Sequence, residues 1–368
     1  MKIEQNPHKK WKWVWISFSL VFFIFISLTV ISINRTLLEP GSDPVSARLA
    51  EWGRDHGLGP VVTELENLQY KFNKPKLGGK VEIKILPKPK IKLIGLQPDI
   101  LTIANPPLPG EGVYQTAVKK GKEPIIQFAQ LRPDLIHTSY LATVVWMSGI
   151  KTRFELRPGF SEPGRLERFK VTDLVSNREK NLLATFNSGF KINSSQGGFY
   201  LGSVVVKPLL KGSATLVTYQ DGHSDIGIWG RDFKMSHDIV SARQNLKLLI
   251  DNGAISSNIQ TAVQSNWGAT LGSKDFVWRS GIGVTLEGDF VFVCGPALSA
   301  QSLADLLLHA GAFRAMQLDI NPQWISYMWY VKSSGGVKRP IKAALFDRKA
   351  DRYFEPSSRD FYAVYTRQ

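Results

Sequence analysis

The chain has almost no cysteine. Its 368 residues include one cysteine, Cys294, so no disulfide can form within it. The sequence has six histidines, and they are scattered. It lacks H-E-x-x-H, G-x-S-x-G, a P-loop and paired C-x-x-C motifs. We therefore predict neither a metal site nor a cofactor. Cys294 lies in "DFVFVCGP", where a small core residue of a strand is favoured over a nucleophile.

Acidic residues are also short in supply. Asp and Glu total 31 against 46 Lys and Arg, a formal net charge of +15. A basic surface favours anionic partners such as nucleic acid, anionic lipid or a phosphate-rich polymer. The chain is otherwise of normal globular balance, with 43% hydrophobic and 21% charged residues.

A long apolar run stands near the N-terminus, "WKWVWISFSLVFFIFISLTVISI", residues 11–33. After Lys12 it has no charge for about twenty positions, the length that spans a bilayer. Lys9, Lys10 and Lys12 place the N-terminus in the cytoplasm by the positive-inside rule. A cleaved signal peptide is the alternative, but no A-x-A pattern follows. We predict a single-pass cell-membrane anchor with the C-terminal domain extracellular, or a secreted domain if the segment is cleaved. Nucleic acid is therefore a disfavoured partner.

Three zones follow from composition. Residues 1–35 are the tail and anchor, 36–125 hold short helices and a Lys/Pro-rich linker region, and 126–368 form the main domain. The short helices are expected within 45–70, broken at the Gly/Pro cluster 57–60. The stretch 74–95 alternates Val, Ile and Leu with Lys. This pattern predicts edge strands with a solvated lysine face, or a docking face for an anionic polymer.

The main domain is rich in short β-like runs separated by turn residues. Two helices are expected, over 235–250 and over 299–311. In the second, Ser299 can cap the start and Gly311 can end it. The fold class predicted is α+β, a mixed or antiparallel twisted sheet with a few packed helices, preceded by one N-terminal transmembrane helix.

The run "AMQLDINPQW" ends a predicted strand in an acid, Asp319, followed by Asn321-Pro322. Period-two alternation puts Gln317 and Asp319 on one face. A strand-end acid can be a general acid, a nucleophile or a substrate clamp. It can equally cap a local turn.

Arg279 lies in "VWRSGIGVTLEGDFVFV", a predicted hairpin turning at 287–289. An arginine beside glycines on a strand suits bidentate holding of phosphate or carboxylate, and a sheet-edge ion pair is the alternative. In "ATFNSGF", Asn187 and Gly189 follow a strand and could contact a ligand, or form an ordinary turn. Asn266 and Trp267 could contact a sugar ring, although a core Trp is the more common case.

These segments, in this order, resemble the phosphodiester glycosidase family. Members carry an N-G-G-F-like start, an R-T/S-x-x-G strand, an E-L-A helix and a strand ending L-D-G-G-G-S. The counterparts here are 187–190, 279–283, 303–304 and 318–319, and the likeness covers residues 125–368. The ending "RDFYAVY" resembles a membrane-anchored or secreted actinobacterial branch. Residues 320–323 depart from the glycine-rich segment of the family.

The resemblance implies a hydrolase of a sugar phosphodiester in a wall polymer or glycolipid. Asp319 would be the main carboxylate and Arg279 would hold phosphate, as the catalytic pair. Asn187, Gln317 and Asn321 would bind sugar hydroxyls or orient the acid. Asp225 and Asp232 are candidates for a second carboxylate. The alternatives are an envelope protein that binds anionic glycan without catalysis, and a membrane-proximal scaffold whose helices at 45–70 hold a partner.

Overall fold

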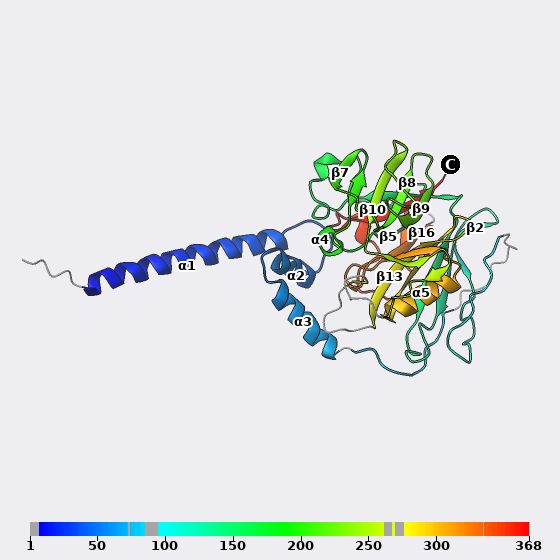
Figure 1. The fold of residues 1–368 in the computed structure, drawn as a ribbon, viewed down its shortest axis with the longest axis horizontal. Coiled ribbons are helices and arrows are strands. Elements are labelled where there is room, and N and C mark those ends of the chain that lie inside the picture. Colours follow the sequence, from blue (N-terminus) through cyan, green and yellow to red (C-terminus); the bar gives the residue numbers. More distant parts are fainter. Residues whose placement is uncertain are drawn as a thin grey trace, which may run out of the picture. The chain divides into compact units, whose positions relative to one another are not determined.

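The computed structural model describes residues 7–72, 74–84, 95–260, 267–268, 276–333 and 335–367. The chain forms two compact units, Met1–Glu66 and Asn67–Gln368. Figure 1 shows the elements of each unit coloured along the chain.

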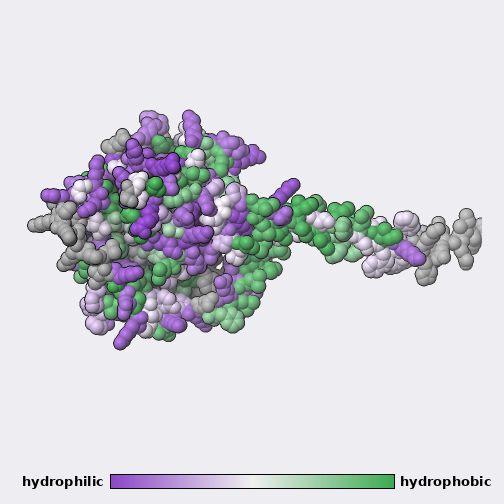
Figure 2. Space-filling view, turned by 180° about the vertical axis from the view of Figure 1, so that it is seen from behind, coloured by the Kyte–Doolittle hydropathy of each residue, from purple (hydrophilic) through white to green (hydrophobic). Residues whose placement is uncertain are grey.

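The first unit is built on helix α1, Pro7–Leu37. Its segment Trp11–Leu37 has a window of mean hydropathy 2.5 with none of it buried, so it is long and apolar enough to cross a membrane. The side chains of α1 form an apolar surface (Figure 2), in contrast with the mixed, mostly polar surface of the second unit. Such a surface needs an apolar solvent, which a bilayer supplies.

Helices α2, Val45–Asp55, and α3, Gly59–Phe72, complete the predicted short helices of 45–70. Arg48 of α2 donates to the carbonyls of Thr36, Leu37 and Gly41 at 3.3, 3.2 and 2.8 Å, which satisfies the open end of α1. Trp52 Nε1 donates to Ser32 Oγ at 2.9 Å, so α2 lies back along the last turns of α1.

In the second unit, antiparallel pairing joins the described strands into three sheets. The first has the order β1-β2-β3-β14-β13-β15-β11-β12. Its strands are Gln115–Lys120, Glu123–Leu131, Ala142–Met147, Phe290–Leu298, Val277–Val284, Arg314–Gln317, Leu248–Asp251 and Ala254–Ile255.

The second sheet has the order β7-β6-β10-β8-β9, with strands Val204–Lys207, Phe199–Leu201, Ile239–Gln244, Ala214–Tyr219 and Ser224–Ile228. The third has the order β17-β16-β5-β18-β4, with strands Lys338–Lys342, Tyr327–Lys332, Leu182–Asn187, Phe361–Thr366 and Thr152–Arg157. Short helical turns are η1, Leu166–Arg168, α4, Ile192–Ser195, and η3, Arg352–Phe354. The predicted α+β class with an antiparallel sheet is confirmed.

The predicted helix at 299–311 is α5, Ala300–His309. Ser302 N–H donates to Ser299 Oγ at 3.0 Å, and Ser299 N–H donates to Ser302 Oγ at 2.8 Å, a reciprocal capping box. Leu303, Leu306 and Leu307 are fully buried on one face of the helix. They pack in a cluster with Val291 and Val293 of β14, so α5 covers one face of the first sheet.

The opposite face of the first sheet packs against the third sheet. Phe292 of β14 lies 5.7 Å from Phe186 of β5 and 5.0 Å from Tyr327 of β16, between ring centroids. Cys294 belongs to this core cluster, is fully buried, and burial raises the pKa of its thiol to about 12. Its predicted role as a core residue is confirmed, because a thiol this hard to ionise is a poor nucleophile.

Two local predictions are wrong. The segment 235–250 forms strands β10 and β11 instead of a helix, because β10 pairs with both β6 and β8 and buries Arg243 against a carboxylate. Pairing on both edges overrides local helix propensity. Residues 74–84 carry no strand, since Gly78 and Gly79 have φ of +66° and +98° there. The rest of that lysine-rich stretch, 85–94, lies outside the described residues.

Candidate functional site

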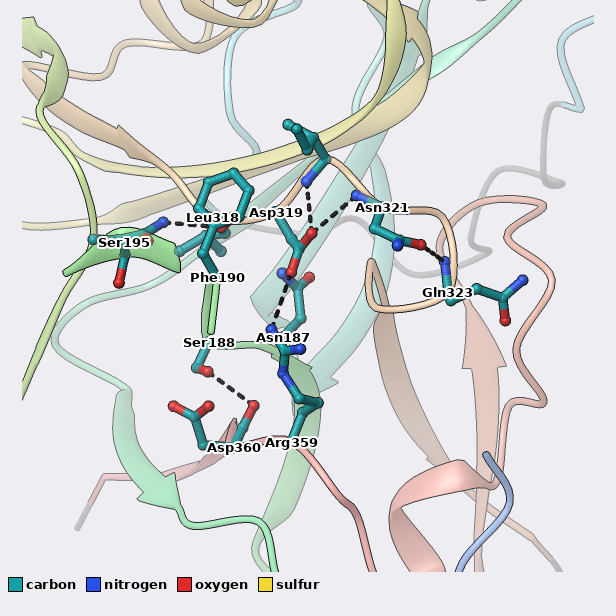
Figure 3. A network of polar contacts seen from close by, with 12 residues as sticks. Asn187, Ser188, Phe190, Ser195, Leu318, Asp319, Asn321, Gln323, Arg359 and Asp360 are labelled. Carbon is teal, nitrogen blue, oxygen red and sulfur yellow. Dashed lines mark hydrogen bonds and ion pairs between the residues drawn. The ribbon is translucent and has the colours of Figure 1, made fainter. Parts of the chain in front are cut away.

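Asp319 lies just beyond the end of β15, at the start of a tight turn. Its Oδ1 accepts hydrogen bonds from the N–H groups of Ile320 at 2.7 Å and Asn321 at 2.9 Å. Asn321 Oδ1 in turn accepts from Gln323 N–H at 2.9 Å (Figure 3). Pro322 has no N–H and so needs no partner between them. The run Asp-Ile-Asn-Pro-Gln therefore makes two successive side-chain-capped turns.

The hydroxyl of Ser280, within β13, joins this turn to the end of β5. Ser280 Oγ accepts from Asp319 N–H at 3.2 Å and from Asn187 Nδ2 at 3.1 Å. Asn187 Oδ1 accepts from Ser326 N–H at 3.1 Å. Asn187, at the end of β5, is thus held beside Asp319, as Figure 3 shows. The two residues, expected separately from the ends of two strands, therefore lie around the same serine.

The second oxygen of the Asp319 carboxylate faces a cation that the sequence reasoning missed. Arg359 Nη2 lies 3.8 Å from Asp319 Oδ2, and the two side chains are 9% and 3% exposed. The Arg359 guanidinium also lies 4.9 Å from the ring centroid of Trp324, in the same turn. An arginine held on an aromatic face near a carboxylate keeps a fixed orientation. Arg359 lies two residues before β18 and is the first residue of the ending "RDFYAVY", which was the available signal.

A buried ion pair holds together the segments around Asp319 and Arg359. Arg243 Nε donates to Asp360 Oδ2 at 2.8 Å, and both side chains are fully buried. Arg243 Nη2 donates to Phe190 O at 2.6 Å, and Ser188 Oγ donates to Asp360 O at 2.8 Å. The loop after Asn187 is thereby tied to the residue that follows Arg359 (Figure 3). Gly189 has φ of +154°, and a Cβ on it would lie 3.2 Å from Cγ of Asn245, so close packing requires this glycine.

One more carboxylate reaches this region from the loop after β4. Glu162 N–H donates to Ser358 O at 2.9 Å, and Gly159 N–H donates to Glu162 O at 2.8 Å. A Cβ on Gly159 would stand 2.5 Å from Arg359 C, so the loop lies directly on the chain before β18. Burial raises the pKa of the Glu162 carboxyl, and the charges that act on it are Arg359, Asp360, Arg243 and Lys191.

Arg279 and Gln317 form a separate network on the α5 side of the sheet. Arg279 Nε donates to Leu298 O at 2.8 Å, and Nη1 donates to Trp267 O at 3.1 Å and Gln317 Oε1 at 2.8 Å. Gln317 Nε2 donates to Trp267 O at 2.6 Å. Arg279, Gln317 and Trp267 are only 4%, 1% and 5% exposed.

Gln317 and Asp319 were expected on one face of the strand, but their side chains contact different groups. Strand β15 ends at Gln317, so period-two alternation stops before Asp319. The Gln317 amide bonds to the Arg279 network, and the Asp319 carboxylate bonds to its own turn and to Arg359.

The remaining predicted residues lie elsewhere. Asp225 of β9 is 3.9 Å from Arg314 of β15, and burial raises the pKa of its carboxyl. Asp232 pairs with Arg231 at 2.8 Å. Trp267 packs in the core cluster under α5, the alternative that its sequence context left open. Asn266 lies outside the described residues. Within the described ranges, no group of three or more His, Cys, Asp or Glu side chains could hold a metal ion.

No family model matches the sequence, and no curated protein matches it. Among solved structures, the chain is similar to the catalytic domain of zebrafish N-acetylglucosamine-1-phosphodiester alpha-N-acetylglucosaminidase, auto-inhibited by its pro-peptide. The identity is 15%, the coverage 69% of this chain and 87% of that one, and the TM-score 0.45. A protein of Synechocystis is similar at 13% identity over 66% of this chain and 62% of that one, with a TM-score of 0.37. Such distant likeness carries no functional argument, so function must come from the residues of the site.

Proposed function

We propose that the chain is an extracytoplasmic hydrolase that cleaves the sugar C–O bond of a sugar phosphodiester in an envelope polymer or glycolipid. The observation that carries this proposal is the geometry of Asp319. Two backbone N–H groups hold one of its oxygens, and the other oxygen faces Arg359. A fixed carboxylate beside a fixed guanidinium suits a reaction in which the sugar becomes positive and the leaving group negative.

The burial of Asp319 favours one of the two roles open to a glycosidase carboxylate. Its side chain is 3% exposed, which leaves little room for covalent attack on a sugar. A buried, fully oriented negative charge instead stabilises an oxocarbenium-like transition state without reorganising. Arg359 would hold the phosphate, a task for which its planar fork is suited. Asn187 would position Asp319 through Ser280.

Helix α1 supports placement at the membrane. Proteolytic cleavage after the apolar run would remove Ser32, which accepts the hydrogen bond of Trp52. It would also expose the carbonyls at the end of α1 to which Arg48 of α2 donates. An uncleaved anchor keeps these bonds. We expect the intact mass of the chain purified from membranes to include residues 1–35, and a mature chain lacking them would contradict the anchor.

The direct test is release of free sugar from synthetic methyl diesters of sugar 1-phosphates. Asp319→Asn removes the negative charge but keeps the volume, so we expect kcat to fall by about 10²–10³-fold. Asp225→Asn, a carboxylate of another sheet, is the matched control and should keep wild-type kcat. Turnover that survives Asp319→Asn undiminished would rule out the assignment.

A second function is favoured by the same turn. The Asp319 carboxylate caps its own loop, and residues 320–323 replace a glycine-rich segment of the resembled family. A protein that binds anionic glycan without cutting it would keep this turn as a purely structural feature. That function predicts saturable binding of the same diesters with no sugar released.

A further inference from the structure

Helix α3 carries an exposed apolar stripe along one face. Val61, Leu65, Leu68 and Phe72 are 56%, 62%, 42% and 86% exposed. Their spacing of four, three and four residues places the four side chains in one row on the helix. Single exposed leucines are common on proteins, whereas a continuous apolar row is a surface that another molecule covers.

Another side of α3 is already used, in a hairpin with α2. A Cβ on Gly53 would lie 2.9 Å from Cγ2 of Val62, so the glycine lets the two helices touch. Arg54 Nη2 donates to Glu66 Oε1 at 2.5 Å. Val62 and Glu66 are four residues apart and share the side that faces α2. These contacts hold α3 in place and leave the stripe open.

Helix α2 sets the level of this hairpin along α1. Trp52 Nε1 donates to Ser32 Oγ at 2.9 Å, and earlier in α2 Arg48 donates to Thr36 O at 3.3 Å. The two helices therefore run in opposite directions, with α2 beside the end of α1 (Figure 1). His56 Nε2, just after α2, lies 3.2 Å from Ser32 Oγ. The turn into α3 is thus at the level of Ser32, where the apolar run ends.

The charges of the hairpin do not suit a lipid surface as the cover of the stripe. Helices that lie on a bilayer carry Lys and Arg beside their apolar face. Among the described side chains of the hairpin, Arg48 closes the end of α1, and Arg54 pairs with acids of both helices. Glu64, next to the stripe, is exposed. Such a helix gains no attraction from anionic headgroups, so a protein helix fits the stripe better.

We propose that the stripe of α3 pairs with the same stripe of a second copy of this chain, as a short parallel coiled coil at the membrane surface. Steps of four and three residues are the spacing of a coiled-coil seam. Two copies anchored by α1 point the same way and hold α3 at the same level. They therefore meet side by side and in register, and each stripe residue faces its own counterpart across a two-fold axis.

The membrane supplies what so small a stripe lacks. Four side chains from each copy make an interface smaller than the ~1,200 Å² that stable soluble complexes bury. Anchoring by α1 confines both copies to one plane and raises their effective concentration. We therefore expect pairing in the membrane and separation in dilute detergent. This inference needs the anchor and is independent of the proposed reaction.

The test compares two cysteines on opposite faces of α3, in the full chain in its membrane. Residues two apart point to nearly opposite sides of a helix, so Thr63→Cys is the matched control for Leu65→Cys. Under mild oxidation we expect about tenfold more disulfide-linked dimer from Leu65→Cys, because only seam positions bring paired β-carbons close. The wild type, whose Cys294 is fully buried, should give none. Equal dimer from both variants, or none from Leu65→Cys, overturns the proposal.

Counting copies in the membrane gives a second readout. A fluorescent fusion of the wild type should bleach in two steps, Leu65→Asp in one and Thr63→Asp in two. Leu65 is exposed, so its substitution should leave the denaturation midpoint unchanged. Single-step bleaching of the wild type contradicts the pairing. Strong quenching of a fluorophore on Leu65→Cys by spin-labelled lipid would show that the bilayer covers the stripe, which also overturns it.

Discussion

Two buried arginines, Arg279 and Arg359, differ in what surrounds them. Arg279 donates to two backbone carbonyls and to the Gln317 amide under helix α5. Arg359 lies against Trp324 with the Asp319 carboxylate at 3.8 Å. Neutral acceptors fix a guanidinium as part of the core. A guanidinium held on an aromatic face beside a carboxylate is the one that we propose to hold the phosphate. The comparison supports our proposal that Arg359, and not Arg279, holds the phosphate.

The largest effect is expected from Arg279→Ala. The substitution leaves Leu298 O, Trp267 O and Gln317 Oε1 without this donor in a buried place, which should lower the free energy of unfolding by about 3 kcal/mol. Chemical denaturation of the full chain measures it, with Arg339→Ala, an exposed arginine of β17, as control. A stable Arg279→Ala protein that has lost only activity would reverse the comparison.

Arg359→Lys should act in the opposite way. Lysine keeps the charge beside Asp319 but loses the planar fork that suits phosphate. We expect kcat/KM for the diester to fall about 100-fold, while the free energy of unfolding changes by about 1 kcal/mol. Steady-state kinetics and denaturation on the same preparation check both. Equal losses of stability in Arg279→Ala and Arg359→Lys would remove the distinction between the two sites.

The sequence predicts much of the fold because its signals are local. The Ser299 cap and the leucine spacing of α5 depend only on neighbouring residues, and both are seen. The prediction at 235–250 failed because strand pairing on both sides of β10, with Arg243 neutralised by Asp360, is decided 117 positions away in sequence.

Part of the site could be predicted for the same reason, because its signals are local. Asp319 and Asn187 could be found because each ends a strand, and Ser280 brings them together. Arg359 begins the ending "RDFYAVY", but nothing local in that run points to Asp319. The position of Arg359 beside Asp319 arises only in the folded chain, where Nη2 of Arg359 lies 3.8 Å from Oδ2 of Asp319. Arg279 had the stronger local pattern, an arginine among glycines, yet Gly281 makes room for Leu303 and Leu307 of α5, and Gly283 for Ala312 and Ala315.

The most direct measurement is a crystal structure of the chain with a bound sugar 1-phosphate. The account predicts that the phosphate lies on the guanidinium of Arg359, with the sugar C1 beside Asp319. A phosphate bound to Arg279, or a sugar bound away from the turn at 319–323, would contradict it.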